Sequence, residues 1–282
     1  MRRERLTITL QKGILKKLDK IVDGNTIRNR SHAIETILRD QLKSNVLSHA
    51  VMLGGGEGIE FKGKHISKLL LPINGETIIE HNIEILKSYG ITDLIFSLGE
   101  MGDQVREKLG DGSKYGIKVV YFERDRGTAG VLRQAKSLLE NTFLMMNGDI
   151  LLANVDLEYM YEFHKNSGGM ATMLLVTADS SASLGSVRMK GNIITQFIEK
   201  PNESEKSSHL INGGIYLFNP EVCSLVFPET QSLENDIFPK LAKEEKLFGY
   251  LFDGEWIHLH DVSKYKEFLK NNKKGNVENN YS

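Results

Sequence analysis

The sequence predicts an α/β protein: a doubly wound, mostly parallel mixed sheet that follows a small N-terminal strand–helix–helix unit. Two observations predict this. From residue 46 onward, short apolar runs alternate with amphipathic helical segments, which is typical of a parallel sheet covered by helices. The charge also changes, because residues 1–45 carry a net +6 within a chain whose net charge is −1. We expect domains over 1–45 and 46–270, and a flexible polar tail over 271–282.

The N-terminal unit has its own pattern. Polar and apolar residues alternate over 5–11, which predicts one half-buried strand, and apolar residues recur at helical spacing over 14–22 and 33–42. One strand and two short helices cannot bury these apolar faces alone. We therefore expect the unit to pair with a second copy, giving a homodimer or a tetramer.

This order of elements, with Asn29-Arg30-Ser31 at the second helix, resembles the ribbon-helix-helix family of dimeric repressors over residues 3–43. The resemblance implies a double-stranded DNA operator as partner, bound without any cofactor. Arginine and threonine on the outer strand face suit base edges, and Ser31 as N-cap beside Arg30 suits a phosphate. The alternative is a unit that only oligomerises. The residues expected at the DNA are Arg3, Arg5, Thr7, Thr9, Asn29, Arg30 and Ser31.

The larger domain is expected to place a phosphate site after its first strand. Strands are predicted at 51–53, 94–98, 119–122 and 143–146, and helices at 78–89, 104–109 and 129–139. Open parallel sheets bind ligands beyond the carboxyl ends of their strands. The run Gly54-Gly55-Gly56-Glu57-Gly58 follows the first strand and lets backbone N–H groups approach an anion.

Other composition signals narrow the class of protein. No apolar run approaches the ~18 residues of a membrane span, and the first residues lack the apolar stretch of a signal peptide. We expect a cytoplasmic protein without membrane contact. The single cysteine, Cys223, excludes an intrachain disulfide and a cysteine-cluster metal site, and its apolar neighbours indicate a core position.

Six motifs follow the glycine run in a fixed order. They are Lys68 before Leu71-Pro72, Gly127-Thr128-Ala129-Gly130, Asn147-Gly148-Asp149, Glu199-Lys200-Pro201, Asn212-Gly213-Gly214, and Trp256. In this order and spacing they resemble the sugar-phosphate nucleotidyltransferases over residues 49–268. That family joins a nucleoside triphosphate to a sugar 1-phosphate and releases pyrophosphate, and its sheet is of the nucleotide-diphospho-sugar transferase type.

The resemblance implies a role for each matched position. The glycine run and Lys68 would hold the triphosphate, Asp149 would bind Mg²⁺, and in an active enzyme Lys68 and Asp149 would be the catalytic candidates. Further positions would contact the base, the sugar or the sugar phosphate. The full set of expected ligand-binding residues is Gly54, Gly55, Gly56, Gly58, Lys68, Glu123, Gly127, Asp149, Glu199, Lys200, Asn212 and Gly213.

Two departures from the family pattern bear on catalysis. Where the family's glycine loop continues to an arginine, this chain has Ile59-Glu60, and a carboxylate in place of a cation would repel the triphosphate by several kcal/mol. Lys62 or Lys64 could take the place of that arginine at the triphosphate. Where the family has a second metal-binding aspartate, this chain has His258, which is a poor Mg²⁺ ligand because Mg²⁺ prefers oxygen.

The replaced aspartate leaves two interpretations. His258 and His260, with Asp149 or Asp261, could bind a transition metal, or the histidines could simply fill the vacated metal site.

These departures favour a ligand sensor over a catalyst. The resulting hypothesis is a DNA-binding transcription regulator whose nucleotidyltransferase-like domain senses a nucleotide, sugar phosphate or nucleotide sugar. The alternative is an active sugar-1-phosphate nucleotidyltransferase that uses Mg²⁺ and whose N-terminal domain dimerises it or regulates its own gene. A third interpretation is a structural scaffold with an empty pocket. Pyrophosphate release discriminates the first two.

Overall fold

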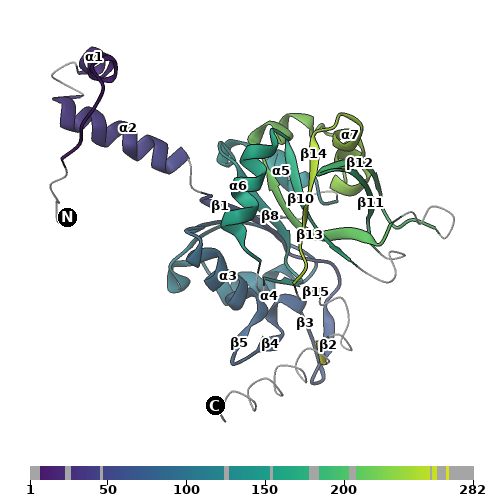
Figure 1. The fold of residues 1–282 in the computed structure, drawn as a ribbon. Coiled ribbons are helices and arrows are strands. Elements are labelled where there is room, and N and C mark those ends of the chain that lie inside the picture. Colours follow the sequence, from purple (N-terminus) through teal and green to yellow (C-terminus); the bar gives the residue numbers. More distant parts are fainter. Residues whose placement is uncertain are drawn as a thin grey trace, which may run out of the picture. The chain divides into compact units, whose positions relative to one another are not determined.

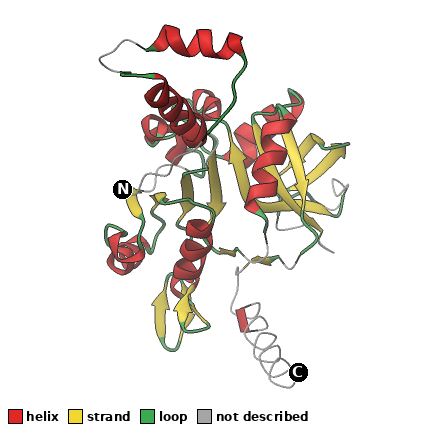
Figure 2. Ribbon diagram, turned by 60° about the vertical axis from the view of Figure 1, so that its left-hand side comes forward, coloured by secondary structure: helices red, strands yellow, loops and turns green. Residues whose placement is uncertain are grey.

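The computed structural model describes nine stretches of the chain. They are residues 7–22, 27–44, 47–123, 127–152, 155–177, 184–202, 208–254, 256–258 and 265–266. The chain divides into two compact units, residues 1–46 and 47–282. Figures 1 and 2 show the elements of both units. Among the described residues, no helix combines the length and apolar character that a membrane span requires.

The first unit consists of two helices, α1 (Lys12–Ile21) and α2 (Arg30–Ser44). Both match the helices predicted from the sequence. The predicted strand over 5–11 is wrong for residues 7–11, which form no strand; the rest of it lies outside the described residues. A ribbon strand needs a partner strand to complete its hydrogen-bond ladder, and the described residues of this unit form no such strand.

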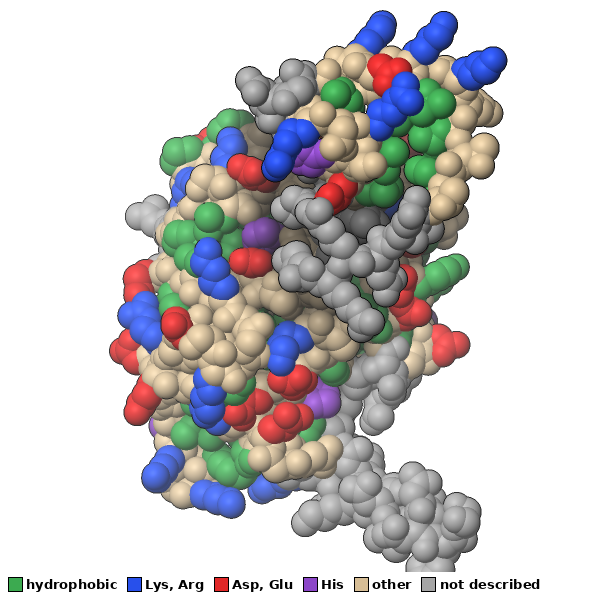
Figure 3. All heavy atoms as spheres, turned by 90° about the vertical axis from the view of Figure 1, so that its left-hand side faces the viewer, with side chains coloured by type: hydrophobic (Ala, Val, Ile, Leu, Met, Phe, Trp, Pro, Cys, Tyr) green, Lys and Arg blue, Asp and Glu red, His purple; other side chains and the backbone are tan. Residues whose placement is uncertain are grey.

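Apolar side chains of the first unit remain largely exposed. Leu18 and Ala33 are buried between the helices. The side chains of Ile8, Ile14, Ile21, Ile37 and Leu38 are 40–50% exposed. In Figure 3 apolar and cationic side chains lie side by side on this unit. The expectation that two short helices cannot bury their own apolar faces therefore holds for the single chain.

The residues expected at DNA are only partly covered by the structure. Arg3 and Arg5 lie outside the described residues, and Thr7 and Thr9 are exposed in the segment that forms no strand. The Arg30 guanidinium is engaged by the Asp19 carboxylate of α1, at 2.7 and 2.9 Å.

The cap of α2 also differs from the prediction. The helix begins at Arg30, and the Asn29 side chain accepts a hydrogen bond from the His32 backbone N–H at 2.9 Å. Asn29 therefore occupies the cap position predicted for Ser31, and asparagine is as good an N-cap as serine.

The second unit is built on a nine-stranded sheet in the order β10-β14-β12-β11-β13-β8-β1-β6-β7 (Figure 1). Its parallel portion is β8-β1-β6-β7, the four strands predicted from the sequence. The bounds are β1 (His49–Leu53), β6 (Asp93–Ser97), β7 (Lys118–Phe122) and β8 (Phe143–Asn147). Their carboxyl ends meet at one edge, as the glycine run after β1 requires.

The other half of the sheet is mainly antiparallel, so the prediction of a mostly parallel sheet holds only for the first half. β13 runs antiparallel to β8, and β10 pairs with both β13 and β14, which curls this half of the sheet back on itself. The bounds are β10 (Ala171–Thr177), β11 (Ser186–Lys190), β12 (Ile193–Ile198), β13 (Leu210–Phe218) and β14 (Leu247–Leu251).

Helices cover both faces of the sheet, which confirms the doubly wound prediction. On β1, Ala50 and Met52 pack toward one face, and Val51 and Leu53 toward the other. The first face is covered by α3 (Ile78–Ser88), α4 (Gly102–Leu109) and α6 (Leu157–Ser167), and the second by α5 (Gly130–Gln134) and α7 (Phe238–Lys243). Two separate apolar cores result, one on each face.

The remaining elements of the second unit are short. Three two-stranded pairs are β2 (Ile59–Phe61) with β3 (Lys64–Ile66), β4 (Pro72–Ile73) with β5 (Glu76–Thr77), and β9 (Ile150–Leu151) with β15 (Ile257–His258). The 3₁₀ turns are η1 (Lys68–Leu70), η2 (Ser113–Tyr115), η3 (Lys136–Leu138) and η4 (Pro220–Leu225), and η5 (Leu233–Ile237) is a turn of π-helix.

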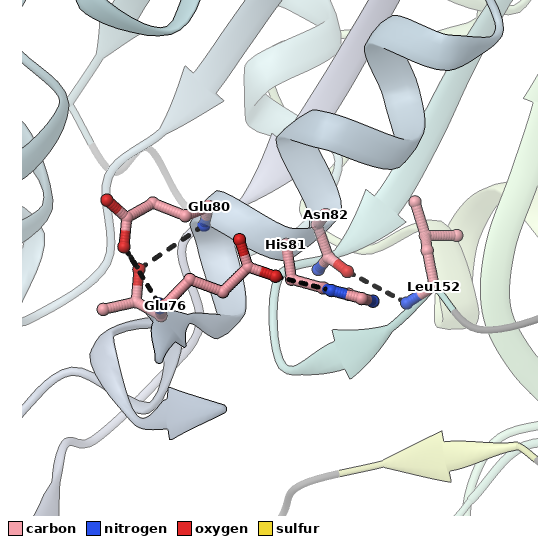
Figure 4. A network of polar contacts seen from close by, with 6 residues as sticks. Glu76, Glu80, His81, Asn82 and Leu152 are labelled. Atoms are coloured by element: carbon pink, nitrogen blue, oxygen red, sulfur yellow. Dashed lines mark hydrogen bonds and ion pairs between the residues drawn. The ribbon is translucent and has the colours of Figure 1, made fainter. Parts of the chain in front are cut away.

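The start of α3 is fixed by a capping box centred on Glu80 (Figure 4). Its Oε2 accepts bonds from the Thr77 backbone N–H and hydroxyl, at 2.9 and 2.7 Å. Its Oε1 lies 2.8 Å from Lys108 Nζ and accepts a bond from the Tyr115 hydroxyl at 3.1 Å. Burial alone would raise the pKa of Glu80, but these partners lower that pKa to about 2.

Replacing Glu80 with glutamine is expected to make stability less sensitive to acid. The folded-state pKa of Glu80 lies below its ordinary 4.5, so the stabilisation is complete above about pH 4.5 and is lost as pH falls toward about 2. The full shift corresponds to about 3 kcal/mol of unfolding free energy. Urea unfolding should therefore separate wild type from Glu80→Gln at pH 7, and the gap should narrow by pH 3.

Glu84→Gln is the matched control for this experiment. Glu84 is on the same helix and pairs with Lys87 at 2.9 Å, but its side chain is 58% exposed. Exposed pairs of this kind contribute roughly 0.5 kcal/mol or less. A gap between wild type and Glu80→Gln that stayed constant from pH 7 to pH 3 would contradict the assignment.

Candidate active site

Two adjoining pockets open at the carboxyl ends of β1, β6 and β8. The glycine pocket is lined by Gly54, Gly55, Gly56, Gly99, Thr128 and Asp149, among others. The carboxylate pocket is lined by Gly185, Glu199, Asn212, Gly214, Glu234 and Trp256, among others. Asn147 and His258 line both pockets, so the two hollows share one wall.

The glycine run forms the floor of the first pocket by packing against the end of β6. The Gly54 backbone N–H donates to the Ser97 carbonyl at 2.7 Å. A Cβ on Gly99 would lie 2.0 Å from the Gly55 carbonyl oxygen, so only glycine permits this approach. Open space lies beside Gly56, where backbone groups can face an anion.

The carboxylate at Glu60 points away from this pocket. Gly58 is covered by the His65 ring rather than opening into the pocket. Glu60 lies on β2, its side chain is 73% exposed, and its carboxylate is 3.4 Å from His65 Nδ1. Lys62, a candidate substitute for the missing arginine, lies over the Phe61 ring at 5.3 Å. The residues after Gly58 form the β2–β3 hairpin, and none of the residues of that hairpin lines either pocket.

Asp149 is a carboxylate of the glycine pocket and lies beside His258 of the shared wall. It follows β8, and the pairing of β9 with β15 brings His258 beside it, with His258 Nε2 3.3 Å from Asp149 Oδ2. Burial alone would raise the pKa of Asp149. The hydrogen bond and charge of His258 and the charge of Lys68 outweigh burial and hold that pKa below its ordinary value. The site thus presents a buried anion beside the His258 ring and within reach of the charge of Lys68.

The carboxylate pocket combines two glutamates with an ordered amide. Asn212 Nδ2 donates to the Tyr216 hydroxyl at 2.8 Å, and its Oδ1 accepts from the Gly214 N–H at 2.9 Å. Burial raises the pKa of Glu199, and the negative charge of Glu234 raises it further. Trp256 Nε1 donates to the Gly213 carbonyl at 3.0 Å and closes one side.

Most of the predicted ligand-binding residues converge on these pockets. Gly54, Gly55, Gly56, Gly127, Asp149, Glu199 and Asn212 line them. Lys68 is close enough for its charge to act on Asp149, and Lys200 for its charge to act on Glu199. Gly213 contributes its carbonyl to Trp256.

Glu123 is placed elsewhere. It is 78% exposed and its Oε1 lies 2.6 Å from the Arg106 guanidinium. His260 and Asp261, named above as candidate metal ligands, lie outside the described residues. Within the residues that are described, no three His, Cys, Asp or Glu side chains gather as a metal site.

Several pocket residues escaped the sequence prediction, among them Gly99, Thr128, Asn147 and Glu234. Gly99 could have been found, because a glycine directly after the second strand of a parallel sheet meets the glycine run after the first. Thr128 and Asn147 belonged to recognised motifs without an assigned role. No sequence pattern pointed to Glu234, because its position depends on the turn η5 folding back against Thr128. The Thr128 hydroxyl donates to Glu234 Oε2 at 2.6 Å.

Comparison with known proteins identifies the second unit. Residues 49–276 match the family model described as nucleotidyl transferase. The chain is 30% identical over 230 residues to mannose-1-phosphate guanyltransferase 2 of Candida glabrata, and 29% identical over 230 residues to the mannose-1-phosphate guanyltransferase of Saccharomyces cerevisiae. Each match covers 78% of this chain and 62% of the relative, so the chain spans less than two thirds of these proteins.

Solved structures share the fold. A crystal structure titled as a putative glucose-1-phosphate thymidylyltransferase from Bacillus anthracis superposes with a TM-score of 0.69 at 23% identity, covering 79% of this chain and 94% of that one. HddC from Yersinia pseudotuberculosis gives a TM-score of 0.64 at 21% identity, and the match covers 79% of this chain and 99% of HddC. These likenesses support the nucleotide-diphospho-sugar transferase type of sheet predicted from the motifs.

These findings correct the regulator hypothesis. The relatives are named as sugar-phosphate nucleotidyltransferases, which favours the enzyme alternative, and nothing in the comparisons supports a ribbon-helix-helix segment or a DNA partner. The hypothesis rested on two replacements, Glu60 and His258, and the first of them lies on an exposed hairpin outside the pocket lining. With its family model matched over 49–276, the chain belongs to the nucleotidyl transferase family.

Proposed function

We propose that this chain is a sugar-1-phosphate nucleotidyltransferase. The observation that carries the proposal is the shared wall of the two pockets, where Asn147 and His258 separate a glycine-lined hollow, which also contains Asp149, from one lined by carboxylates and an amide. Backbone N–H groups suit phosphates, and carboxylates with amides suit sugar hydroxyls. Two substrates bound on either side of this wall would bring their phosphates together.

The chemistry follows from that placement. The sugar-phosphate oxygen attacks the α-phosphorus of the nucleoside triphosphate, a P–O bond forms, and pyrophosphate leaves as the α–β bridge breaks. Catalysis of this kind depends on positioning and on charge stabilisation at phosphate. Gly54, Gly55 and Gly56 would orient the triphosphate, and Lys68 would neutralise part of its charge.

Asp149 is suited to hold Mg²⁺ together with substrate oxygens. Mg²⁺ in nucleotide sites commonly takes one or two carboxylates and completes its shell with phosphates and waters. Asp149 supplies one buried, ionised carboxylate, and His258 stands where a second would be needed. Bound there, Mg²⁺ would neutralise charge on the reacting phosphates.

Measuring pyrophosphate release tests the proposal directly. The full chain would be incubated with Mg²⁺ and a panel of nucleoside triphosphates and sugar 1-phosphates, beginning with GTP and mannose 1-phosphate because the relatives are named for that pair. Release that requires both substrates and yields the nucleotide sugar is the expected result. The absence of release with every pair, for protein whose melting temperature nucleotides raise, would overturn the proposal.

Replacing His258 with aspartate is expected to increase the response to Mg²⁺. A second carboxylate at position 258, beside Asp149, would be repelled by Asp149 unless a cation sits between them. At Mg²⁺ tenfold above its Kd, binding contributes about 1.4 kcal/mol, or about 3–6 °C in melting temperature. Thermal unfolding with Mg²⁺ and with EDTA should show this gain for His258→Asp beyond that of wild type.

His258→Asn is the matched control, because it removes the imidazole without adding charge. Its Mg²⁺ response should not exceed that of wild type. An equal response from the aspartate and asparagine variants would show that position 258 does not face the cation.

A further inference from the structure

Glu234 lines the carboxylate pocket and contacts Thr128, which lines the glycine pocket. It lies on η5, a turn of π-helix, and lines the carboxylate pocket together with Glu199. Single π-turns occur frequently at functional sites because they project a side chain out of the regular helical register. Glu234 is absent from the family motifs recognised in the sequence.

Its carboxylate is held from one side only. The Thr128 hydroxyl donates to Glu234 Oε2 at 2.6 Å, and the Ser232 hydroxyl donates to the same oxygen at 2.7 Å. Among the described residues no hydrogen bond engages Oε1. A carboxylate anchored through one oxygen, with the other at a pocket wall, is a preorganised acceptor for a ligand donor.

Glu234 is also tied to the glycine pocket. Thr128, its anchor, lines that pocket. The Thr128 hydroxyl accepts the Leu233 N–H at 2.9 Å, and Ala129 N–H donates to the Gln231 carbonyl at 3.0 Å. At Gly127, where φ is +66°, a Cβ would lie 2.0 Å from the same carbonyl. These contacts join the segments 127–129 and 231–234 into one rigid piece that serves both pockets.

The charge of the carboxylate pocket selects what can enter it. Glu199 and Glu234 face the same hollow, and the pKa of Glu199 is raised by burial and by Glu234. Two carboxylates near each other repel an anion and favour neutral hydrogen-bond donors. A sugar ring with several hydroxyls fits this demand, whereas its phosphate fits the glycine side.

We propose that Glu234 is a specificity-determining residue whose Oε1 accepts a hydrogen bond from a sugar hydroxyl, while Oε2, through Thr128, links sugar binding to the nucleotide side of the site. This inference rests on the proposed nucleotidyltransferase function.

The Glu234→Gln variant tests the sugar contact. The amide oxygen can still accept from Thr128 and Ser232, but the amide nitrogen that replaces Oε1 cannot accept from a ligand. The KM for the sugar 1-phosphate should rise about 10- to 100-fold, the range expected for losing a hydrogen bond to a charged group, with the KM for the triphosphate changed less than about threefold. The exposed Glu229, in the same connecting segment, provides Glu229→Gln as the control without effect.

Deoxy sugar 1-phosphates identify the hydroxyl. With wild type, one monodeoxy substrate should show a KM raised about as much as Glu234→Gln raises the KM for the intact sugar 1-phosphate. With that same analogue, the KM of Glu234→Gln should equal the KM of wild type, because the two changes remove the same hydrogen bond. Fully additive losses with every analogue would overturn the contact.

Thr128→Val tests the link between the pockets. In wild type, a non-hydrolysable triphosphate should tighten binding of the sugar 1-phosphate in calorimetry, and the valine, which cannot donate to Glu234, should reduce that enhancement. An enhancement equal to wild type would overturn the link.

The failure of this inference and of the proposed function are distinguishable. If wild type releases no pyrophosphate with any pair, the proposed function fails, and calorimetry with nucleotide sugars then tests Glu234 independently of turnover. If wild type turns over and Glu234→Gln keeps its wild-type KM for the sugar 1-phosphate, the role of Glu234 alone is overturned.

Discussion

Replacing Asp149 with asparagine is expected to lower the rate of pyrophosphate release by on the order of 10²–10³-fold. Removing one preorganised electrostatic contact from a transition state typically costs about 2.7–4 kcal/mol, and a metal ligand is worth at least as much. Asparagine preserves the shape of the side chain, so the loss isolates the charge. Initial rates at saturating Mg²⁺ and both substrates measure the effect.

The physical reason lies in how the structure treats this carboxylate. Asp149 is only 17% exposed, yet its pKa is held below the ordinary value by His258 and Lys68 against the effect of burial. A buried carboxylate that stays ionised supplies the kind of oxygen ligand that Mg²⁺ prefers. The asparagine variant should also respond less to Mg²⁺ in thermal unfolding.

Glu60→Gln is the control for this prediction and tests an interpretation of the sequence. If Glu60 repelled the triphosphate, removing its charge would speed the reaction. The structure places it on an exposed hairpin beside His65, so a change of less than about twofold is expected. A large increase in the rate of pyrophosphate release for Glu60→Gln, together with a small decrease for Asp149→Asn, would mean that Glu60 affects catalysis more than Asp149 does.

The sequence predicted the parallel half of the sheet well because its signals are local. Each of β1, β6, β7 and β8 is a short apolar run, and each is followed or preceded by a helical pattern. The antiparallel half was harder. The pairing of β10 with both β13 and β14 joins segments far apart in the chain, and no local pattern encodes such a register.

The site shows the same division. Gly54, Gly55, Gly56 and Asp149 follow strand ends, so their convergence could be predicted from topology. The exposed position of Glu60 could not be predicted, because it depends on the β2–β3 hairpin that forms after Gly58. The predicted strand near residue 8 failed for a related reason, since its pattern anticipates a partner strand that a single chain does not contain.

Asn82 is a further residue that local patterns conceal, and its replacement is expected to have the largest effect on stability. It lies inside the amphipathic helix α3 and is fully buried. Its Nδ2 donates to the Ile150 carbonyl at 2.8 Å. Its Oδ1 accepts from the Leu152 N–H at 2.9 Å, as Figure 4 shows. The amide thus fixes the chain immediately after Asp149.

Asn82→Ala should lower the free energy of unfolding by about 2–5 kcal/mol. The change leaves one buried backbone carbonyl and one buried N–H without their partner, and each unsatisfied group costs about 1–3 kcal/mol. Urea denaturation at pH 7 measures the loss as a lower midpoint. Because Asp149 directly precedes β9, which pairs with β15, turnover should also fall at temperatures where the variant remains folded.

Two further variants separate the hydrogen bonds from simple loss of a side chain. Asn82→Asp can accept from Leu152 but cannot donate to Ile150 while ionised, so it should retain only part of the stability. Asn141→Ala, at an exposed position, should change the unfolding free energy by roughly 0.5 kcal/mol or less. A midpoint for Asn82→Ala within the range of Asn141→Ala would mean that water replaces both bonds, and the chain after Asp149 would then be held by β15 rather than by α3.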